Sequence, residues 1–526
     1  MPFFDFHIHP TLKSLFSEKD DDLQLRKFSP WTPLDKSKIP FLLKCCTDFP
    51  SILQSQGNLA QLVASDCNLV CIALYIPEKD MLTADLLQKS TKGPLSIYLQ
   101  KHKMDSILNG NPYQILRADD WLTLTDADQF GISNKKVKVI KKRSDYDEND
   151  QSTIHVVFSV EGCHTLSSEL QNFDVDTIIR NIDDLRNNVA LLSINLTHME
   201  QSPLCNHAFG MQFLSNEGFR PSGFKIEDKG IRVLKHCYEN KIMIDIKHLS
   251  LGSRQHLYEL RRSPEFDDIR QPIVCTHAGF TGISVKEIPD YLFSFRKFSE
   301  KGYSVYWQGK PVKYGGTPRP CFNASSINLY DEDIIEILLS GGMIGLSLDK
   351  RILGYQDFEQ ESDGRDDFPL ETEYVSNKEE NIFLGNGKVT ISKAFVDFQD
   401  KVIGWDEIEE GGVVDPRMSD YHLKHFMAHI LHVIVIAQKN GYDVMNALNQ
   451  VCIGSDYDGL INPVWVCETA NSLEHFKSEF EDNFVPFAND STIMLPIGFD
   501  VKVFSKKLFF ENGRDFVMNR LDYLNQ

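Results

Sequence analysis

Eight short apolar runs recur along the chain, and stretches with a helical period of apolar residues separate most of them. Short runs without alternating polar residues are typical of strands that are buried on both faces of a parallel sheet. The runs cover residues 3–6, 68–76, 154–160, 189–196, 241–246, 272–276, 342–348 and 451–455. Strands that alternate with helices in this way predict an α/β fold, a (β/α)8 barrel of the TIM type.

Six of the eight predicted strands end in a histidine, a glutamate or an aspartate. In a barrel of this type the carboxyl ends of the strands meet at one rim, and reactive residues gather there. We therefore expect one polar cluster at that rim. Its members are His7, His9, Glu161, His198, His248, His277 and Asp456.

The types of residue in this cluster favour metal binding. His7 and His9 stand two residues apart at the end of the first strand, so their imidazoles project to the same side while Ile8 faces away. Two imidazoles held side by side can share one metal ion. Glu161 ends a buried strand, where a carboxylate is costly unless a cation or hydrogen bonds compensate it.

Two long stretches interrupt the barrel pattern. Residues 278–325, after the sixth strand, contain many glycines, prolines and aromatic residues, and we expect them to be irregular. Residues 354–412, after the seventh, are acidic and glycine-rich, with a predicted hairpin around Asn386 and Gly387. We expect these insertions to cover the catalytic face of a single domain, residues 1–526. The charged stretch 135–153 is interpreted as a solvated hairpin or loop.

The net charge, the apolar runs and the cysteines indicate which partners and which cellular location to expect. The chain has 526 residues and a formal net charge of −20, so we expect neither nucleic acid nor an anionic membrane as a partner. No apolar run approaches the ~18 residues that a membrane-spanning helix needs. The 11 cysteines form no Cys-x-x-Cys motif, and no secretory signal opens the chain. These features predict reduced thiols and a cytoplasmic location.

A second group of histidines lies on the helix predicted over residues 419–440. Its members are spaced three, four and three residues apart, which puts them on one helical face: His422, His425, His429 and His432. This helix would lie outside the barrel, between the seventh and eighth strands. We therefore interpret these residues as core packing and surface histidines and not as metal ligands.

The strand ends resemble the renal (membrane) dipeptidase family of amidohydrolase-like metal-dependent hydrolases. FSVEGCH resembles the strand of that family that ends in Glu-Gly-Gly-His, and INLTHMEQSPLCN resembles its Leu-Thr-His segment. GFRPSG, followed by a helix and IDIKHLS, resembles its Gly-Leu-Thr-Pro-Phe-Gly and Asp-Leu-Ser-His segments. CTHAG and CIGSDYDG resemble its Ser-His-Ser and Gly-Ser-Asp-Phe-Asp-Gly. Order and approximate spacing agree along nearly the whole chain, apart from the insertions.

The resemblance implies two zinc ions and the cleavage of a small amide or peptide bond by a metal-bridging hydroxide. His7 and His9 would bind the first ion, His248 and His277 the second, and Glu161 would bridge both. The resemblance also implies that His198 polarises the substrate carbonyl. Asp456 would accept the proton of the bridging water and pass it to the leaving nitrogen. Related enzymes are often dimers, so the resemblance also suggests a homodimer.

Two departures from the family pattern leave the substrate open. The family has His-x-Asp on the first strand, where this chain has His7 and His9. The family also carries an arginine that holds the dipeptide carboxylate, and the equivalent segment 324–327 has none. Arg319 and Lys286 are the candidates to replace it. The alternatives are a binuclear amidohydrolase acting on a cyclic amide, a lactone or another ester, and a non-catalytic binding protein on the same barrel.

Overall fold

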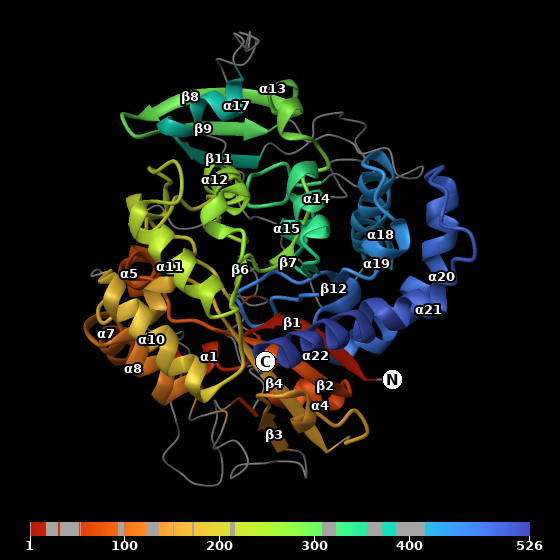
Figure 1. The fold of residues 1–526 in the computed structure, drawn as a ribbon, viewed down its shortest axis with the longest axis horizontal. Coiled ribbons are helices and arrows are strands. Elements are labelled where there is room, and N and C mark those ends of the chain that lie inside the picture. The colour runs from red at the N-terminus through yellow and green to blue at the C-terminus, as the bar shows by residue number, and fades with distance from the viewer. Residues whose placement is uncertain are drawn as a thin grey trace.

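Eight parallel strands surround the centre of the molecule in a computed structural model (Figure 1). Their order in the sheet is their order in the chain, and all are buried. They are β1 (Phe3–Ile8), β2 (Cys67–Leu74), β4 (Thr153–Val160), β5 (Leu191–Ile194), β6 (Met243–Asp245), β7 (Ile273–Ala278), β10 (Met343–Leu346) and β12 (Val451–Ile453). The structure describes residues 2–16, 30–31, 52, 54–92, 99–121, 124, 136–150, 152–170, 173–210, 216–307, 322–354, 371–385 and 416–525.

The barrel closes between its last and first strands just beyond the end of β12. The backbone N–H of Asp456 donates to the carbonyl of His7, and that of His9 donates to Tyr457, both over 2.9 Å. The buried carboxylate of Asp5 adds side-chain bonds across the seam, because it accepts from the backbone N–H of Ser455 over 2.9 Å and from its hydroxyl over 2.5 Å. The predicted (β/α)8 fold and its eight strands are confirmed, whereas the single domain stays a prediction.

Helices cover the outside of the barrel and close one end of it. The longer ones are α10 (Val175–Asn188), α11 (Asp228–Glu239), α12 (Leu251–Arg262), α14 (Asp331–Leu339), α18 (Pro416–Lys439), α20 (Leu473–Asp490) and α22 (Asn512–Leu524). Side chains of α22, including Val517 and Leu521, join the cluster formed by inward-facing residues such as Phe4 and Val157. The amino-terminal end of the barrel is therefore packed, and its opposite rim is left for the polar cluster.

The charged stretch 135–153 differs from the expected hairpin or loop. Residues Lys136–Val139 form strand β3, which pairs in parallel with the first half of β4. Its lysines are exposed while Val137 is buried. This alternation is a strand signal that the high charge of the stretch obscures.

The two insertions also differ from expectation, because they meet in one antiparallel sheet. This sheet has the order β11 (Glu371–Ser376), β9 (Gly302–Trp307) and β8 (Leu292–Ser299), and lies at the top of Figure 1. Residues 292–307 are therefore not irregular. The first part of the predicted hairpin is helix α17 (Glu380–Leu384), and Asn386 and Gly387 lie outside the described residues.

The described residues agree with two expectations, the lack of a membrane-spanning helix and reduced cysteines. None of their helices is long and apolar enough to cross a membrane. The eight described cysteines are all buried free thiols.

Candidate metal centre

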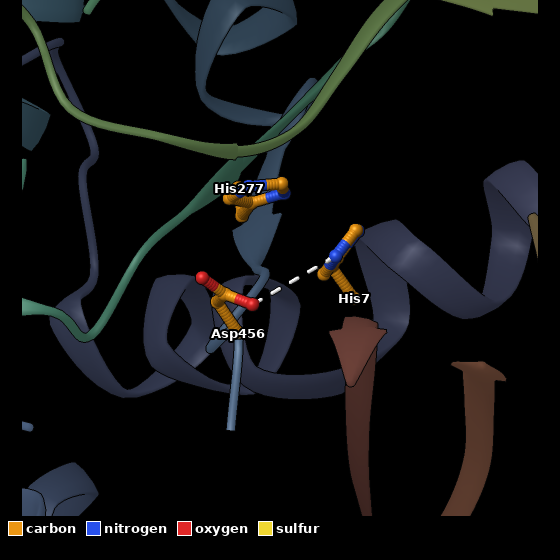
Figure 2. Close-up of side chains that lie close together, drawn as sticks. All are labelled: His7, His277 and Asp456. Carbon is orange, nitrogen blue, oxygen red and sulfur yellow. Dashed lines mark ion pairs between the residues drawn. The ribbon is translucent and has the colours of Figure 1, made fainter. Parts of the chain in front are cut away.

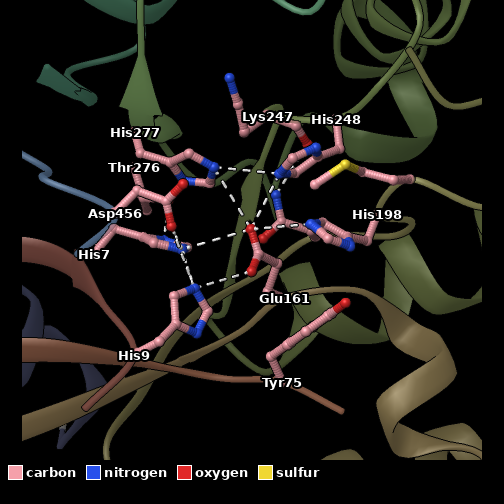
Figure 3. A network of polar contacts seen from close by, with 12 residues as sticks. His7, His9, Tyr75, Glu161, His198, Lys247, His248, Thr276, His277 and Asp456 are labelled. Carbon is pink, nitrogen blue, oxygen red and sulfur yellow. Dashed lines mark hydrogen bonds and ion pairs between the residues drawn. The ribbon is translucent and has the colours of Figure 1, made fainter. Parts of the chain in front are cut away.

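Two pairs of imidazoles face one carboxylate at the carboxyl rim of the barrel (Figure 3). The Nε2 atoms of His7 and His9 lie 3.1 Å apart, and those of His248 and His277 lie 3.2 Å apart. Glu161 lies between the pairs, with Oε2 3.2 Å from His9 Nε2 and Oε1 3.0 Å from His248 Nε2. The structure therefore brings together the five residues that the sequence proposes as ligands.

The two expected catalytic residues border this group. Asp456 Oδ1 lies 3.5 Å from His9 Nε2 and 3.8 Å from His7 Nε2. Figure 2 shows its carboxylate facing the ring of His7, with His277 beside them. His198 Nε2 lies 3.7 Å from Glu161 Oε1. All seven predicted site residues thus converge, although their roles stay predictions.

Thr276 fixes the orientation of two of the imidazoles. Its hydroxyl donates to Asp245 Oδ2 over 2.5 Å, so its oxygen is available to accept from ring nitrogens. The Nδ1 atoms of His7 and His277 lie 2.8 Å and 3.2 Å from that oxygen. A ring that donates from Nδ1 presents the lone pair of Nε2, so both rings offer a ligand atom to the centre of the site.

Glu78 fixes the orientation of the His198 ring through a hydrogen bond to its Nδ1 atom. The Nδ1 of His198 donates to Glu78 Oε1, and the backbone N–H of Met199 donates to the same oxygen over 3.3 Å. The hydroxyl of Tyr75 donates to Glu78 Oε2 over 2.5 Å. Burial would raise the pKa of Glu78, but the imidazoles of His198 and His164 hold it well below its usual range. The ring of His198 therefore rests against a charged carboxylate and directs Nε2 into the site.

The electrostatics of the cluster favour a cation. Burial would raise the pKa of Glu161, but the surrounding imidazoles, those of His198 and His7 first, hold it well below its usual range. Burial would lower the pKa of His9, yet hydrogen bonds to Asp456 and Glu161 raise it to about 10. Burial lowers the pKa of His248 to about 3. The carboxylates of Glu161 and Asp456 therefore favour positive charge in the cluster, and a proton on His9 supplies one such charge.

The donor set fits divalent metal ions. Two facing Nε2 lone pairs at about 3 Å repel each other unless a proton or a cation lies between them. Imidazole nitrogen and carboxylate oxygen are ligands that zinc and similar ions prefer. Three overlapping groups of potential ligand atoms, each spanning less than 4.8 Å, occur among these residues: His7, His9 and Glu161; Glu161, His198 and His248; His7, His277 and Asp456.

A cavity opens on this cluster. Much of its wall is apolar and includes Met81, Met199, Phe209, Ile327 and Leu460. The ring of Phe209 packs against Tyr374 of β11 with a centroid distance of 4.9 Å. The insertion sheet therefore supports one wall of the cavity.

Neither residue proposed to replace the carboxylate-binding arginine is among the described residues that line this cavity. Arg319 lies outside the described residues, and Lys286 is exposed and does not line the cavity. The lysine and arginine side chains that do line the cavity are those of Lys247 and Arg351.

The four histidines of α18 are buried. The expectation that they pack in the core is confirmed, and the expectation that some lie on the surface is wrong. All four are at most 4% exposed. The ring of His429 lies 4.1 Å from that of Phe322, and His432 Nε2 lies 2.9 Å from Asp331 Oδ1. Residues 421–437 of this helix are buried or intermediate throughout, so all four rings lie inside the protein.

No family model matches the sequence, and no curated protein matches it. The fold is similar to that of solved metallopeptidases. One is from Rhodobacter sphaeroides, liganded with a phosphinate mimic of the dipeptide L-Ala-D-Ala, with a TM-score of 0.48, 14% identity and coverage of 99% of both chains. Another is a probable dipeptidase from Pseudomonas aeruginosa, with a TM-score of 0.47, 12% identity and coverage of 89% of this chain and 90% of the other. A dipeptidase described as a metallopeptidase has a TM-score of 0.46 and 13% identity, covering 99% and 98%.

Proposed function

We propose that the protein is a metal-dependent hydrolase that holds two divalent ions, zinc being the expected metal, and cleaves a small amide or peptide bond as a dipeptidase does. One observation carries the proposal: two imidazole pairs, with Nε2 separations of 3.1 and 3.2 Å, flank the single carboxylate of Glu161. His7 and His9 would hold one ion, His248 and His277 the other, and Glu161 both.

When bound, two such ions supply an acidified water molecule and positive charge near the developing oxyanion. The chain itself supplies the proton chemistry. Asp456 Oδ1, which lies 3.5 Å from His9 Nε2, would accept the proton of the attacking water and deliver it to the leaving nitrogen. Glu78 holds Nδ1–H of His198, so that a protonated ring can donate from Nε2 to the substrate carbonyl oxygen.

The test is metal analysis of the purified full chain together with turnover of a defined panel. The panel contains L-Ala-L-Ala, L-Ala-D-Ala, a cyclic amide and a lactone. We expect about two metal ions per chain and dipeptide hydrolysis that chelation abolishes and zinc restores. His248→Gln should lose one of the two ions and the hydrolysis, whereas His475→Gln, at a side chain that is 65% exposed and outside the site, should keep two ions and full activity.

Other outcomes would redirect the proposal. Two bound ions with turnover of only the cyclic amide or the lactone would replace the peptide bond by one of the alternative bonds. Absence of both metal and turnover would contradict the hydrolase and favour a binding protein on the same barrel. A homodimer and a cytoplasmic location stay predictions from the resemblance and from the cysteine pattern.

A further inference from the structure

Lys247 brings a buried amino group, without a carboxylate in ion-pair distance among the described residues, to the wall of the cavity. It lies two residues after the end of β6 and directly precedes His248, and only 2% of its surface is exposed. The side chain lines the cavity beside the imidazole cluster. Figure 3 shows it extending away from Glu161 and the imidazoles, so its ammonium group lies apart from the candidate metal ligands.

The ammonium group has fewer partners than it can use. It can donate three hydrogen bonds, and Nζ donates one, a long contact of 3.4 Å to the carbonyl of Ile327. Within the part of the chain that the structure describes, no carboxylate oxygen makes an ion pair with Nζ. A buried ammonium group that lacks a partner is costly, so an anion that binds beside this amino group would stabilise its charged form.

Among the described residues of the cavity wall, Arg351 is the other lysine or arginine, and it is already paired. Arg351 Nη2 lies 2.5 Å from Asp349 Oδ2, and Nε lies 3.0 Å from both oxygens of the same carboxylate. This bidentate pair leaves Arg351 with little charge to offer a ligand. Lys247 is therefore the better candidate for anion binding.

We propose that Lys247 determines substrate specificity by binding a carboxylate group of the substrate. This inference rests on the proposed function, because it assumes that the reacting bond lies at the imidazole cluster. A single ammonium group matches a single negative charge. A dianionic phosphate would also meet the carboxylates of Asp349 and Asp456, which line the same cavity. The apolar residues Met199 and Ile327 nearby strengthen the attraction by excluding water.

The test compares two ligands of nearly equal shape, N-acetyl-L-alanine and its neutral amide, by calorimetry on the purified full chain. We expect the wild type to bind the carboxylate at least 10-fold more tightly than the amide. Lys247→Met should remove this preference and leave binding of the amide unchanged. Lys286→Met, a matched change at the exposed lysine, should behave as the wild type. Because Lys247→Met removes a buried amino group that makes only one long hydrogen bond, its Tm should equal or exceed that of the wild type.

The failure of this inference can be told from the failure of the proposed function. Loss of preference in Lys247→Met would support the inference even if no dipeptide were hydrolysed. Equal binding of carboxylate and amide by the wild type, or an unchanged preference in Lys247→Met, would overturn it even if dipeptides were hydrolysed. Tighter binding of inorganic phosphate than of N-acetyl-L-alanine would overturn the assignment to a carboxylate. If Lys247→Met does not fold, Lys247→Gln and the wild-type comparison answer the same question.

Discussion

Replacing Thr276 by valine tests whether outer hydrogen bonds hold the candidate ligands in place. The change keeps the shape of the side chain and removes its hydroxyl. His7 Nδ1 and His277 Nδ1 then lose the acceptor that lies 2.8 Å and 3.2 Å away, and Asp245 loses its hydroxyl donor. Each buried donor left without an acceptor costs about 1–3 kcal/mol, and the rings gain freedom to rotate.

The expected magnitude follows from these lost bonds. Removal of an outer partner of a metal-binding histidine weakens metal affinity roughly 10–100-fold, which corresponds to about 1.4–2.7 kcal/mol. Since one hydroxyl serves two rings here, we expect an effect near the upper end. Thr276→Ser keeps the hydroxyl and should retain most of the affinity.

The assay is a zinc titration of the full chain against a competing chelator at constant pH and 25 °C. Circular dichroism of each variant checks that the fold is kept. If Thr276→Val folds and binds zinc with the affinity and stoichiometry of the wild type, the role assigned to Thr276 is wrong. The same result would remove the reason given for the orientation of the His7 and His277 rings.

Three further changes test other parts of the structure. Glu78→Gln should lower kcat by roughly 10²-fold with little change in KM, because the ring of His198 loses its charged partner; Glu78→Asp should restore part of the loss, and an equal fall with both variants would contradict the role. Burial raises the pKa of Glu379 to about 7, so the folded chain holds this proton to a higher pH than the unfolded chain. Stability should therefore fall by on the order of 3 kcal/mol as pH rises from about 4.5 to 7, and chemical denaturation of Glu379→Gln should show a flatter pH profile. Lys13→Met should lower the free energy of unfolding by about 3 kcal/mol, because the buried carboxylate of Asp458 loses its ammonium partner at 2.6 Å. The control Lys101→Met, at an exposed ion pair, should lower it by less than about 1 kcal/mol. Equal losses of stability in the two variants would contradict this reasoning.

The barrel and the composition of the polar cluster could be predicted because both leave local signals. A strand buried on both faces is a continuous apolar run, and the residue that follows it lies at the carboxyl rim. Glu161 and His277 follow such runs directly, so their convergence depends only on the closure of the barrel. The (β/α)8 topology then brings together residues that are hundreds of positions apart in the chain.

Features that depend on partners distant in the chain could not be predicted. Thr276 and Asp245 lie within apolar strands, and nothing in their own neighbourhood indicates that one hydroxyl serves two imidazoles. Glu78 follows a strand and a proline, as many surface residues do. Strand β11 pairs with β9 from Glu371↔Trp307 to Ser376↔Gly302, and its own sequence does not indicate this distant partner.

The most direct test of the binuclear site is anomalous diffraction at the zinc edge from crystals of the purified full chain. Two peaks should lie on opposite sides of the Glu161 carboxylate, one beside His7 and His9 and the other beside His248 and His277. Absence of anomalous signal at Glu161, or signal confined to the histidines of α18, would contradict the central claim.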